Sequence, residues 1–291
     1  MDGLPGGAPR RQRMVGEGDM SKTPVSVTRA QLAAGLRELG LAEGDSLIIH
    51  SSLSSMGHME GGAEAVIEAL LEAIGPRGNL MLPAFNYSAP VPEPYFDPAT
   101  TPARTGAIPE AGRKRPGAVR SLHPSHSVAV IGPQAVELTR DHLSVRAFGI
   151  GSPIDRLAQM GGKVLLLGVG HTSHSLIHVA EEYAGVPKVS FYPEARFFNV
   201  LMPDGSVRPH QLDTSPSCST AFGAAELVLR QAGEIHDARI GAAKVQLMSA
   251  AAVVRLVKRI ITEKPDILLC TWPSCKPCVG VRRNLRAMEK K

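Results

Sequence analysis

Residues 46–82, SLIIHSSLSSMGHMEGGAEAVIEALLEAIGPRGNLML, carry the pattern from which the architecture of the chain can be inferred. A short apolar run stands at each end, at 46–49 and at 80–82, and such runs are too short for helices but suit buried strands. Between them, the apolar residues of 63–74 recur at helical spacing and mark one face of a helix. Strand, helix and strand in this order are typical of an α/β fold in which helices cover a sheet.

The rest of the chain extends the same pattern. Further buried strands are predicted at 128–131 and 164–167, and further helices near 175–184, 221–232 and 249–263. An Asp-Gly turn at 204–205 stands between two strand-like segments, 196–202 and 207–212, which predicts a β-hairpin. We therefore expect a single three-layer α/β/α domain around a mixed sheet, with the hairpin as an insertion.

The two ends of the chain differ from its middle. Residues 1–25 are rich in Gly, Pro and Arg without periodicity, which predicts a disordered tail. Thr28 followed by Gln31 has the spacing of a helix capping box, so the domain is expected to span residues 26–280. Residues 281–291 are expected to form a basic C-terminal tail. Within the domain, the long proline-rich segment 84–120 is expected to be a functional loop.

The composition excludes several classes of protein. Hydrophobic residues make up 43% of the 291 residues, too many for a disordered chain. No apolar run reaches the roughly 18 residues needed to span a membrane, and the N-terminus has no apolar signal segment. Four cysteines are too few for a disulfide framework and suit a reducing compartment. We expect a cytoplasmic protein with no membrane partner.

The net charge of +5 could indicate a nucleic-acid-binding protein. Much of the excess, however, lies at the two ends of the chain, and aromatic residues make up only 4%, which leaves little to stack on bases. We therefore expect no nucleic-acid partner. Basic residues in the interior of the sequence could instead serve a cofactor that carries phosphates.

The richest stretch in potential catalytic groups is GVGHTSHSLIHVAEE, residues 168–182. It directly follows the predicted strand 164–167, and ligands of α/β sheets bind at the carboxyl ends of strands. In a helix near 175–184, Glu181 or Glu182 would lie one turn from His178. A histidine suits proton abstraction near neutral pH, and a carboxylate on its other nitrogen would fix the tautomer.

Two alternatives to a catalytic base remain open at this stretch. The residues could be ordinary polar side chains of a partly exposed helix. A metal-dependent hydrolase is the second alternative, because the residue types and spacing also suit metal ligands, namely His171, His174, His178 and Glu181. Spacing alone does not separate a base from a metal site.

Two more polar stretches adjoin predicted strands. HSSLSSMG, residues 50–57, follows the first strand, and RSLHPSHS, residues 120–127, precedes the strand 128–131. Small hydroxyl residues and glycine at a strand end let backbone N–H groups approach a ligand closely. Each stretch alone is weak evidence, because polar loops beside strands are common.

Taken in order along the chain, these stretches resemble the aminoglycoside 3-N-acetyltransferase family, whose fold differs from the more common acetyltransferase fold. The likeness runs from about Thr28 to Cys278. Its strongest block is PGAVRSLHP, residues 116–124, continuing to Ser127. HSSLSSMG at 50–57 followed by Gly-Gly at 61–62, and HVAE at 178–181, are further matching blocks.

The resemblance implies acetyl-coenzyme A as donor and a small-molecule amine as acceptor, with no covalent acetyl-enzyme and no metal. His178 would be the general base and Glu181 its partner. The residues implied to hold coenzyme A come from the two polar stretches and are His50, Ser51, Ser52, Leu53, Ser54, Arg120, Ser121, His123 and Ser127. Those implied to meet the acceptor are His171, Thr172 and Glu182. The oligomeric state is left open, with a homodimer as one option.

Two features of the sequence bear on the identity of the acceptor. Many aminoglycoside-modifying members of this family carry Asp where this chain has Thr172. Residues 186–240, where much of the acceptor pocket is expected, hold six acidic and five basic residues, which is poor electrostatics for attracting a polycation. An acetyltransferase of the same family that acts on an amine other than an antibiotic therefore remains an alternative.

Three of the four cysteines crowd near the C-terminus. Cys270, Cys275 and Cys278 have the spacing C-x4-C-x2-C, and a zinc knuckle would need a fourth ligand from Cys218 or a histidine. The family resemblance also covers a terminal Cys-x-x-Cys. We therefore expect a structural turn with reduced thiols and no bound metal.

Overall fold

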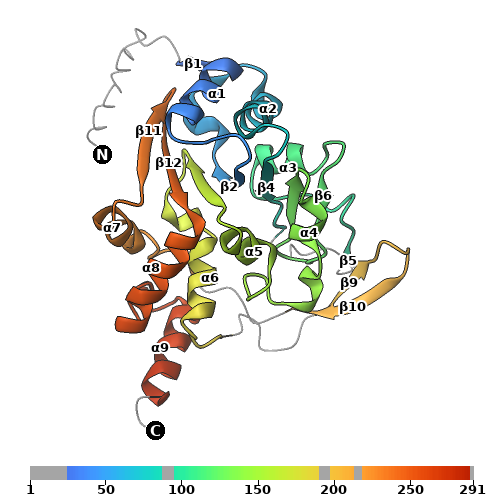
Figure 1. Cartoon of the computed structure of the whole chain (residues 1–291). Coiled ribbons are helices and arrows are strands. Elements are labelled where there is room, and N and C mark those ends of the chain that lie inside the picture. Colours follow the sequence, from blue (N-terminus) through green and yellow to red (C-terminus); the bar gives the residue numbers. More distant parts are fainter. Residues whose placement is uncertain (1–24, 87–94, 190–196, 213–217, 289–291) are drawn as a thin grey trace, which may run out of the picture.

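The computed structural model describes residues 25–86, 95–189, 197–212 and 218–288 (Figure 1). Its centre is a sheet with the strand order β11-β12-β8-β2-β4-β7-β6. The bounds of these strands are β2 (Ser46–Ser51), β4 (Asn79–Pro83), β6 (Val119–Arg120), β7 (Val128–Ile131), β8 (Lys163–Leu167), β11 (His236–Ile240) and β12 (Ala243–Ser249). The central strands β8, β2 and β4 are parallel and the outer pairs are antiparallel, so the sheet is mixed, as predicted.

Helices cover both faces of this sheet. One face carries α1 (Arg29–Glu38), α2 (Gly62–Ile74) and α3 (Ala107–Gly112). The other carries α4 (Ala135–Thr139), α5 (Pro153–Gln159), α6 (Leu176–Tyr183), α7 (Ala224–Gln231) and α8 (Ala250–Glu263). The three-layer α/β/α prediction is confirmed.

The core strands divide their side chains between the two faces. Leu47 and Ile49 of β2 pack with the α1–α2 layer, while Ile48 between them packs with the α6–α8 layer. All three are fully buried. Successive strand residues point to opposite faces, so a strand buried on both sides is apolar at every position. This explains why the short apolar runs of the sequence are strands.

Helix starts follow the capping chemistry of the sequence. The side chain of Thr28 accepts a hydrogen bond from the backbone of Gln31, and the Gln31 side chain accepts one from the backbone N–H of Thr28. This is the predicted capping box. At α8, the Ser249 side chain accepts a hydrogen bond from the backbone N–H of Ala252.

The predicted hairpin is present as β9 (Phe197–Leu201) and β10 (Val207–Gln211), which are antiparallel. The turn is closed by a hydrogen bond from Met202 N to Ser206 O, and Gly205 supplies the left-handed backbone with φ of 79°. The proline-rich segment adds a third strand, β5 (Tyr95–Phe96), parallel to β9. The small sheet therefore joins the hairpin to part of the long loop. A separate parallel pair consists of β1 (Ser26–Val27) and β3 (His58–Met59).

The expected C-terminal tail is wrong for most of its length. Residues 281–288 belong to a helix, α9 (Lys276–Met288), and Val281 is buried. Cys278, Val281 and Leu285 are spaced three and four residues apart and pack against the α6–α8 core. The many basic residues around them hide this apolar spacing in the sequence. Arg282 fixes this helix by donating to the backbone oxygens of Leu269 and Cys270.

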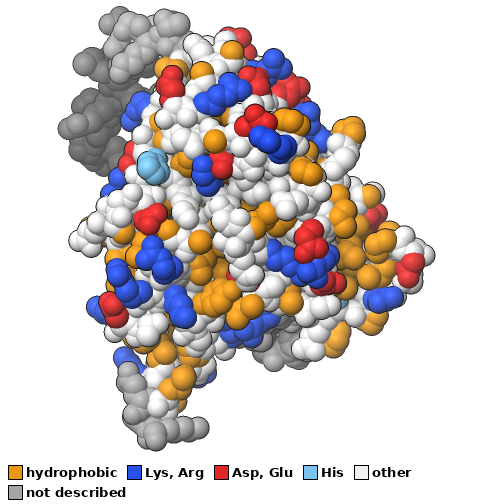
Figure 2. Space-filling model, viewed as in Figure 1, with side chains coloured by type: hydrophobic (Ala, Val, Ile, Leu, Met, Phe, Trp, Pro, Cys, Tyr) orange, Lys and Arg blue, Asp and Glu red, His pale blue; other side chains and the backbone are white. Residues whose placement is uncertain are grey.

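Charged side chains of both signs share the surface. On the face shown in Figure 2, Lys and Arg side chains are interspersed with Asp and Glu. Arg230, for example, forms ion pairs with Glu226 and with Asp237. Opposite charges therefore partly neutralise one another on this face, although the chain as a whole carries a positive net charge.

The N-terminal tail predicted over residues 1–25 lies outside the described residues except for Val25, whose carbonyl oxygen accepts a hydrogen bond from His58 N. In the part of the chain that the structure describes, no helix is long and apolar enough to cross a membrane.

Candidate active site

The candidate site lies where the parallel strands β2 and β8 end side by side. Ser52 N donates to Leu167 O, so the loop after β2 is tied to the end of β8. Gly168 follows β8 with φ of 69°, and a Cβ atom there would lie 1.6 Å from Ser55 Oγ. Only glycine allows this close approach. The stretches 50–57 and 168–182 are therefore neighbours at the carboxyl ends of the strands, as the sequence pattern predicts.

His178 and Glu181 form the central pair of this site. Both lie on α6, and His178 Nδ1 is 2.8 Å from Glu181 Oε2. Both residues are buried, with Glu181 only 2% exposed. A carboxylate at Nδ1 favours the tautomer with a proton on Nδ1, which makes Nε2 the basic nitrogen. This arrangement can hold an imidazole ready to take a proton.

Two phenylalanines form the walls around the His178 ring. Phe148 stacks on it with ring centroids 4.9 Å apart and an interplanar angle of 24°. Phe222 contacts it edge-on with centroids 4.7 Å apart. Both phenylalanines are buried. They fix the plane of the imidazole and keep water from most of its surface, which strengthens electrostatic interactions there.

Glu182, expected to meet the acceptor, has other partners. Its carboxylate forms an ion pair with Arg146 and another with Lys188, whose Nζ lies 2.8 Å from Oε1. The side chain is only 3% exposed. Of the two adjacent glutamates, Glu181 therefore contacts His178, and Glu182 joins α6 to two cationic side chains from segments that flank the helix in sequence.

His50 anchors the start of α6 to the end of β2. Its Nε2 accepts a hydrogen bond from Ser175 N at 3.3 Å, which requires a neutral ring. Burial lowers the pKa of His50 to about 3, and the nearby His178 acts in the same direction. His50 thus connects the end of β2 to the segment that begins the helix carrying His178, and its ring is buried.

The other two histidines of the stretch 168–182, His171 and His174, contact each other. His171 Nδ1 lies 3.2 Å from His174 Nδ1, and both rings are buried. They lie at the short 3-10 helix η3 (His171–Ser173), whose Thr172 is exposed. Thr172 is thus the one of the three expected acceptor-binding residues that lies open at the surface.

A cavity of about 520 Å³ opens beside the loop after β2. It is lined by Ser51, Ser52, Leu53, Ser54, Gly57, His58, Met59, Gly106, Ala107 and Ile108. Four of the five residues expected to hold the cofactor in the first polar stretch therefore face one cavity, and His50 is the exception. Ser51 Oγ is buried and has no hydrogen-bond partner among the described residues.

The side chains of the second polar stretch contact the protein itself. Arg120 donates to Ser127 Oγ and to the backbone oxygens of Pro98, Thr101 and Ala84, and its guanidinium lies over the Phe96 ring. Through these contacts Arg120 connects the proline-rich segment to the sheet. These carbonyl contacts occupy the guanidinium in this structure, and a role of Arg120 in binding coenzyme A stays a prediction.

Ser121, His123 and Ser127 are likewise buried and bonded to the protein. Ser121 Oγ accepts from Val128 N and pairs with His142 Nδ1, while His123 Nδ1 accepts from His126 N. Burial lowers the pKa of His123 well below its usual value. None of these residues lines the cavity beside β2. In this structure the side chains of Ser121, His123 and Ser127 bond to the protein, and their contact with coenzyme A stays a prediction.

Comparisons with known proteins identify the family. A family model for aminoglycoside 3-N-acetyltransferases matches residues 48–262, most of the chain. The chain is also 36% identical over 259 residues to aminoglycoside N(3)-acetyltransferase VII from Streptomyces paromomycinus, with 78% of this chain and 89% of that protein covered. The chain belongs to the aminoglycoside 3-N-acetyltransferase family.

Solved structures agree with this assignment to the aminoglycoside 3-N-acetyltransferase family. A mutant of aminoglycoside acetyltransferase AAC(3)-IVa in complex with a gentamicin superimposes with a TM-score of 0.79 at 30% identity, covering 91% of this chain and 99% of that one. AAC-IIIb in its binary complex with CoASH gives a TM-score of 0.72 at 30% identity, covering 82% and 97%. The chain is thus an acetyl-coenzyme A-dependent N-acetyltransferase, and the resemblance seen in the sequence is confirmed.

This membership decides against the metal-dependent hydrolase alternative. Among residues 25–86, 95–189, 197–212 and 218–288, His171, His174, His178 and Glu181 do not form a group whose ligand atoms converge on one point. The pairs His171–His174 and His178–Glu181 are separate contacts.

Sequence reasoning misses Phe148 and Phe222 as members of the site of this acetyltransferase. Phe148 lies 30 residues before His178, and nothing in the sequence places it against that ring. Phe222 lies far along the chain, in a segment without a motif. The one feature of the sequence that could draw attention to them is that phenylalanine is rare, with seven in the whole chain. Three of the seven form one cluster with His126 and His178, namely Phe85, Phe148 and Phe222.

Proposed function

We propose that this enzyme transfers the acetyl group of acetyl-coenzyme A to the 3-amine of an aminoglycoside, with His178 as general base and Glu181 as its partner. The observation that carries the proposal is the buried His178–Glu181 pair, enclosed by Phe148 and Phe222 at the carboxyl end of the sheet. Relatives with bound gentamicin and with bound CoASH support the two substrates. The reaction is proposed to take place in the cytoplasm, where acetyl-coenzyme A is made and thiols stay reduced.

The chemistry needs one proton transfer and no covalent enzyme intermediate. The acceptor amine attacks the thioester carbonyl, the N–C bond forms, and the C–S bond breaks to release the coenzyme A thiolate. His178 Nε2 takes the proton that the nitrogen loses, and the imidazolium can return it to the leaving sulfur. Glu181 stabilises the positive ring through Nδ1, as the carboxylate of a catalytic triad does.

The donor is proposed to occupy the cavity beside β2. Its lining by Ser51, Ser52 and Ser54 offers hydroxyl groups to the amides of the pantetheine arm. Ser52 and Ser54 contact each other at 3.3 Å and lie on the surface side of the loop, while Ser55 is turned inward and donates to Ser52 O. The loop is therefore held by its own hydrogen bonds while other hydroxyls stay available to a ligand.

The acceptor is the part of the proposal for which an alternative has its own observation. Thr172 is exposed, and the family resemblance places Asp at this position in many aminoglycoside-modifying members, so residue 172 itself offers no carboxylate to a polycation. The alternative is an amine other than an antibiotic, with fewer positive charges than an aminoglycoside, as the natural acceptor. It differs from the first proposal only in the acceptor, since donor, base and mechanism stay the same.

A thiol-release assay with acetyl-coenzyme A tests both versions. The enzyme would be supplied with gentamicin, apramycin and a set of monoamines and diamines, and the acetylated position would be found by mass spectrometry and NMR. Rapid release with an aminoglycoside, and an acetyl group on its 3-amine, is the expected result. Release only with simple amines would favour the alternative, and no release with any amine by folded protein would overturn the proposed function.

A further inference from the structure

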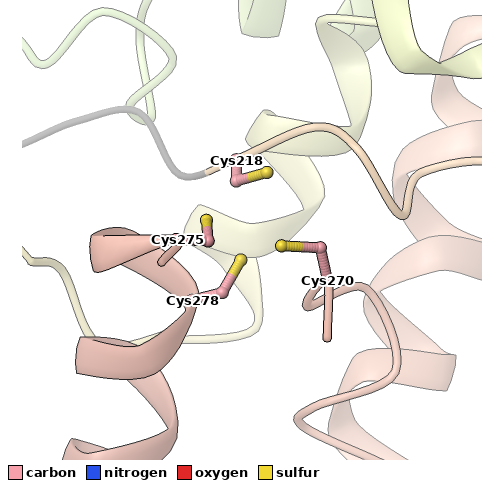
Figure 3. A group of neighbouring side chains, drawn as sticks. All are labelled: Cys218, Cys270, Cys275 and Cys278. Atoms are coloured by element: carbon pink, nitrogen blue, oxygen red, sulfur yellow. The ribbon is translucent and has the colours of Figure 1, made fainter. Parts of the chain in front are cut away.

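All four cysteines of the chain gather in one place (Figure 3). They come from separate segments: Cys218 precedes α7, Cys270 and Cys275 lie between α8 and α9, and Cys278 is in the first turn of α9. Their sulfur atoms all lie within 4.8 Å of one another. Among the residues that the structure describes, these four make up the group whose ligand atoms converge as a metal site requires.

We propose that Cys218, Cys270, Cys275 and Cys278 bind one structural zinc ion as four thiolates. Figure 3 shows the four sulfur atoms turned into one shared space between their segments. A tetrahedral site with Zn–S bonds of about 2.3 Å has its sulfur atoms a little under 4 Å apart, so a small contraction of the cluster would complete it. The cysteines are not paired as disulfides.

The backbone around the cluster suits thiolates. Thr220 N lies 3.4 Å from Cys218 Sγ, two residues earlier in the chain. N–H groups directed at ligand sulfurs are outer-shell contacts that stabilise the anionic form and orient it toward the metal.

Zinc is the metal that this ligand set fits best. Four soft thiolate ligands in a tetrahedron are the usual structural zinc site, with every coordination position filled by protein. No position is left for a substrate, so the ion would hold the structure and take no part in acetyl transfer. Cys275, just before α9, and Cys278, in its first turn, have the C-x2-C spacing that is common in structural zinc sites.

The location explains what such an ion would stabilise. The buried residues of α9 lie in its first two turns: Pro277, Cys278, Gly280 and Val281. A helix with so small a buried face gains little free energy from packing alone. A zinc ion shared with Cys270 and Cys218 would join α9 to the end of α8 and to the segment before α7. Arg282, which donates to the backbone oxygens of Leu269 and Cys270, strengthens the same junction.

The site also has a connection to His178, which rests on the proposed function. Cys218 lies four residues before Phe222, and Phe222 N donates to Ser219 O in the turn between them. Phe222 in turn contacts the His178 ring. Fixing Cys218 would therefore fix one wall around the general base. Phe222 is a positioning residue in this scheme.

Metal analysis tests the zinc site without reference to activity. The full chain would be produced without an affinity tag in zinc-supplemented medium and measured by elemental mass spectrometry. About one zinc per chain is expected, with four thiols that stay unreactive toward a thiol reagent until a strong chelator removes the metal. Less than about a tenth of a zinc per chain, iron in place of zinc, or disulfides among the four cysteines would each overturn the proposal.

Variants separate a metal site from a packing role. Cys218 is partly exposed, so Cys218→Ser should fold while binding zinc at least about tenfold more weakly in competition with a chromogenic chelator. Ser274→Ala, an exposed change in the same C-terminal loop, should keep the zinc of the unchanged protein. Cobalt replacement gives a second readout, because tetrahedral thiolate coordination produces strong sulfur-to-cobalt absorption. A cobalt spectrum without that absorption would contradict four-thiolate ligation even if Cys218→Ser failed to fold.

His178→Ala keeps this inference distinct from the proposed function. That variant should retain the full zinc content, because His178 is outside the cluster. Zinc lost together with His178 would contradict the cysteine site. A zinc-containing enzyme that acetylates no amine would contradict the proposed function and leave the metal site established.

Discussion

His178 Nδ1 lies 2.8 Å from Glu181 Oε2, three residues further along the same helix. Because both side chains are buried, this contact is worth more than it would be in water. The spacing is short enough that the helix itself sets the geometry, and Phe148 holds the ring from one face. The pair has the features of a base whose tautomer is fixed before substrate arrives.

Replacing His178 tests the base directly. His178→Ala should lower kcat by about 10²–10⁴-fold, since that is the usual contribution of a general base. Donor binding should persist, because the proton is taken from the acceptor nitrogen. Steady-state kinetics give the first quantity and calorimetry with coenzyme A the second. Turnover above about a tenth of the original value in the folded variant would show that another group takes the proton.

The two adjacent glutamates offer a matched pair of substitutions. Glu181→Gln should lower kcat by less than His178→Ala does while leaving KM for the donor unchanged, because it weakens the imidazolium. Glu182→Gln should lower the melting temperature more than turnover, because it leaves Arg146 and Lys188 without their carboxylate. Comparing kinetics and thermal unfolding of both variants decides the matter. Equal effects of the two changes on kcat would remove the basis for choosing Glu181.

Much of the fold could be predicted from the sequence, for a reason visible in its strands. β7 is an unbroken apolar run, and so is β8 after its first residue, Lys163; such runs are typical of strands buried on both faces. β11 and β12 cannot be predicted as strands in this way, because they contain more polar residues. His236, Asp237 and Arg239 are polar, and β11 stands at the edge of the sheet with one side toward solvent. Such a strand lacks the apolar run that marks the others.

The site is predictable where contacts are local and not where they are distant. His178 and Glu181 meet because of helical spacing, which a sequence displays. Phe148 and Phe222 reach His178 from far along the chain, and no local pattern encodes such a contact. The contacts of Arg120 could not be predicted for a related reason. An arginine in a polar loop looks the same in sequence whether it binds a phosphate or, as here, backbone oxygens of the proline-rich segment.

Gly168 offers a test of the close packing between the two strand-end loops. Gly168→Ala places a Cβ against Ser55 Oγ and forces a left-handed backbone, which alone costs about 1–3 kcal/mol. Gly170→Ala is a matched control, since that residue has φ of −100° and open space around it. Urea unfolding should show a clear loss for the first variant and a change within about 1 kcal/mol for the second. Equal stabilities would contradict the close contact of the loops.

Thr172 should influence the choice of acceptor. It is exposed on η3, and a carboxylate there could pair with an ammonium group of an aminoglycoside. Thr172→Asp should lower KM for gentamicin by roughly 5- to 150-fold, corresponding to about 1–3 kcal/mol for a good charge-assisted contact, with coenzyme A binding unchanged. Thr172→Asn has nearly the same shape without the charge and is the control. If both variants match the unchanged enzyme, Thr172 lies outside the acceptor pocket.

Acid should begin to lower the free energy of unfolding already near pH 6.5, because several histidines are buried in the neutral form. Burial lowers the pKa of His50, His126 and His142 to about 3 each, from 6.5 in the unfolded chain. Between these values the unfolded chain binds protons that the folded chain does not, so stability falls as pH falls from about 6.5 toward 3. Each such histidine contributes about 1 kcal/mol per pH unit in that window. Urea unfolding at pH 7, 6 and 5 should show this slope.

His142 allows the slope to be assigned to individual rings. Its Nε2 donates to Ala147 O and its Nδ1 accepts from the Ser121 hydroxyl, which itself accepts from Val128 N. A proton on Nδ1 would leave the Ser121 hydroxyl without its acceptor. His142→Gln removes the titration and should make the loss of stability with acid shallower by about 1 kcal/mol per pH unit, whatever it does to stability at pH 7. An unchanged slope would mean that His142 is accessible to protons in the folded enzyme.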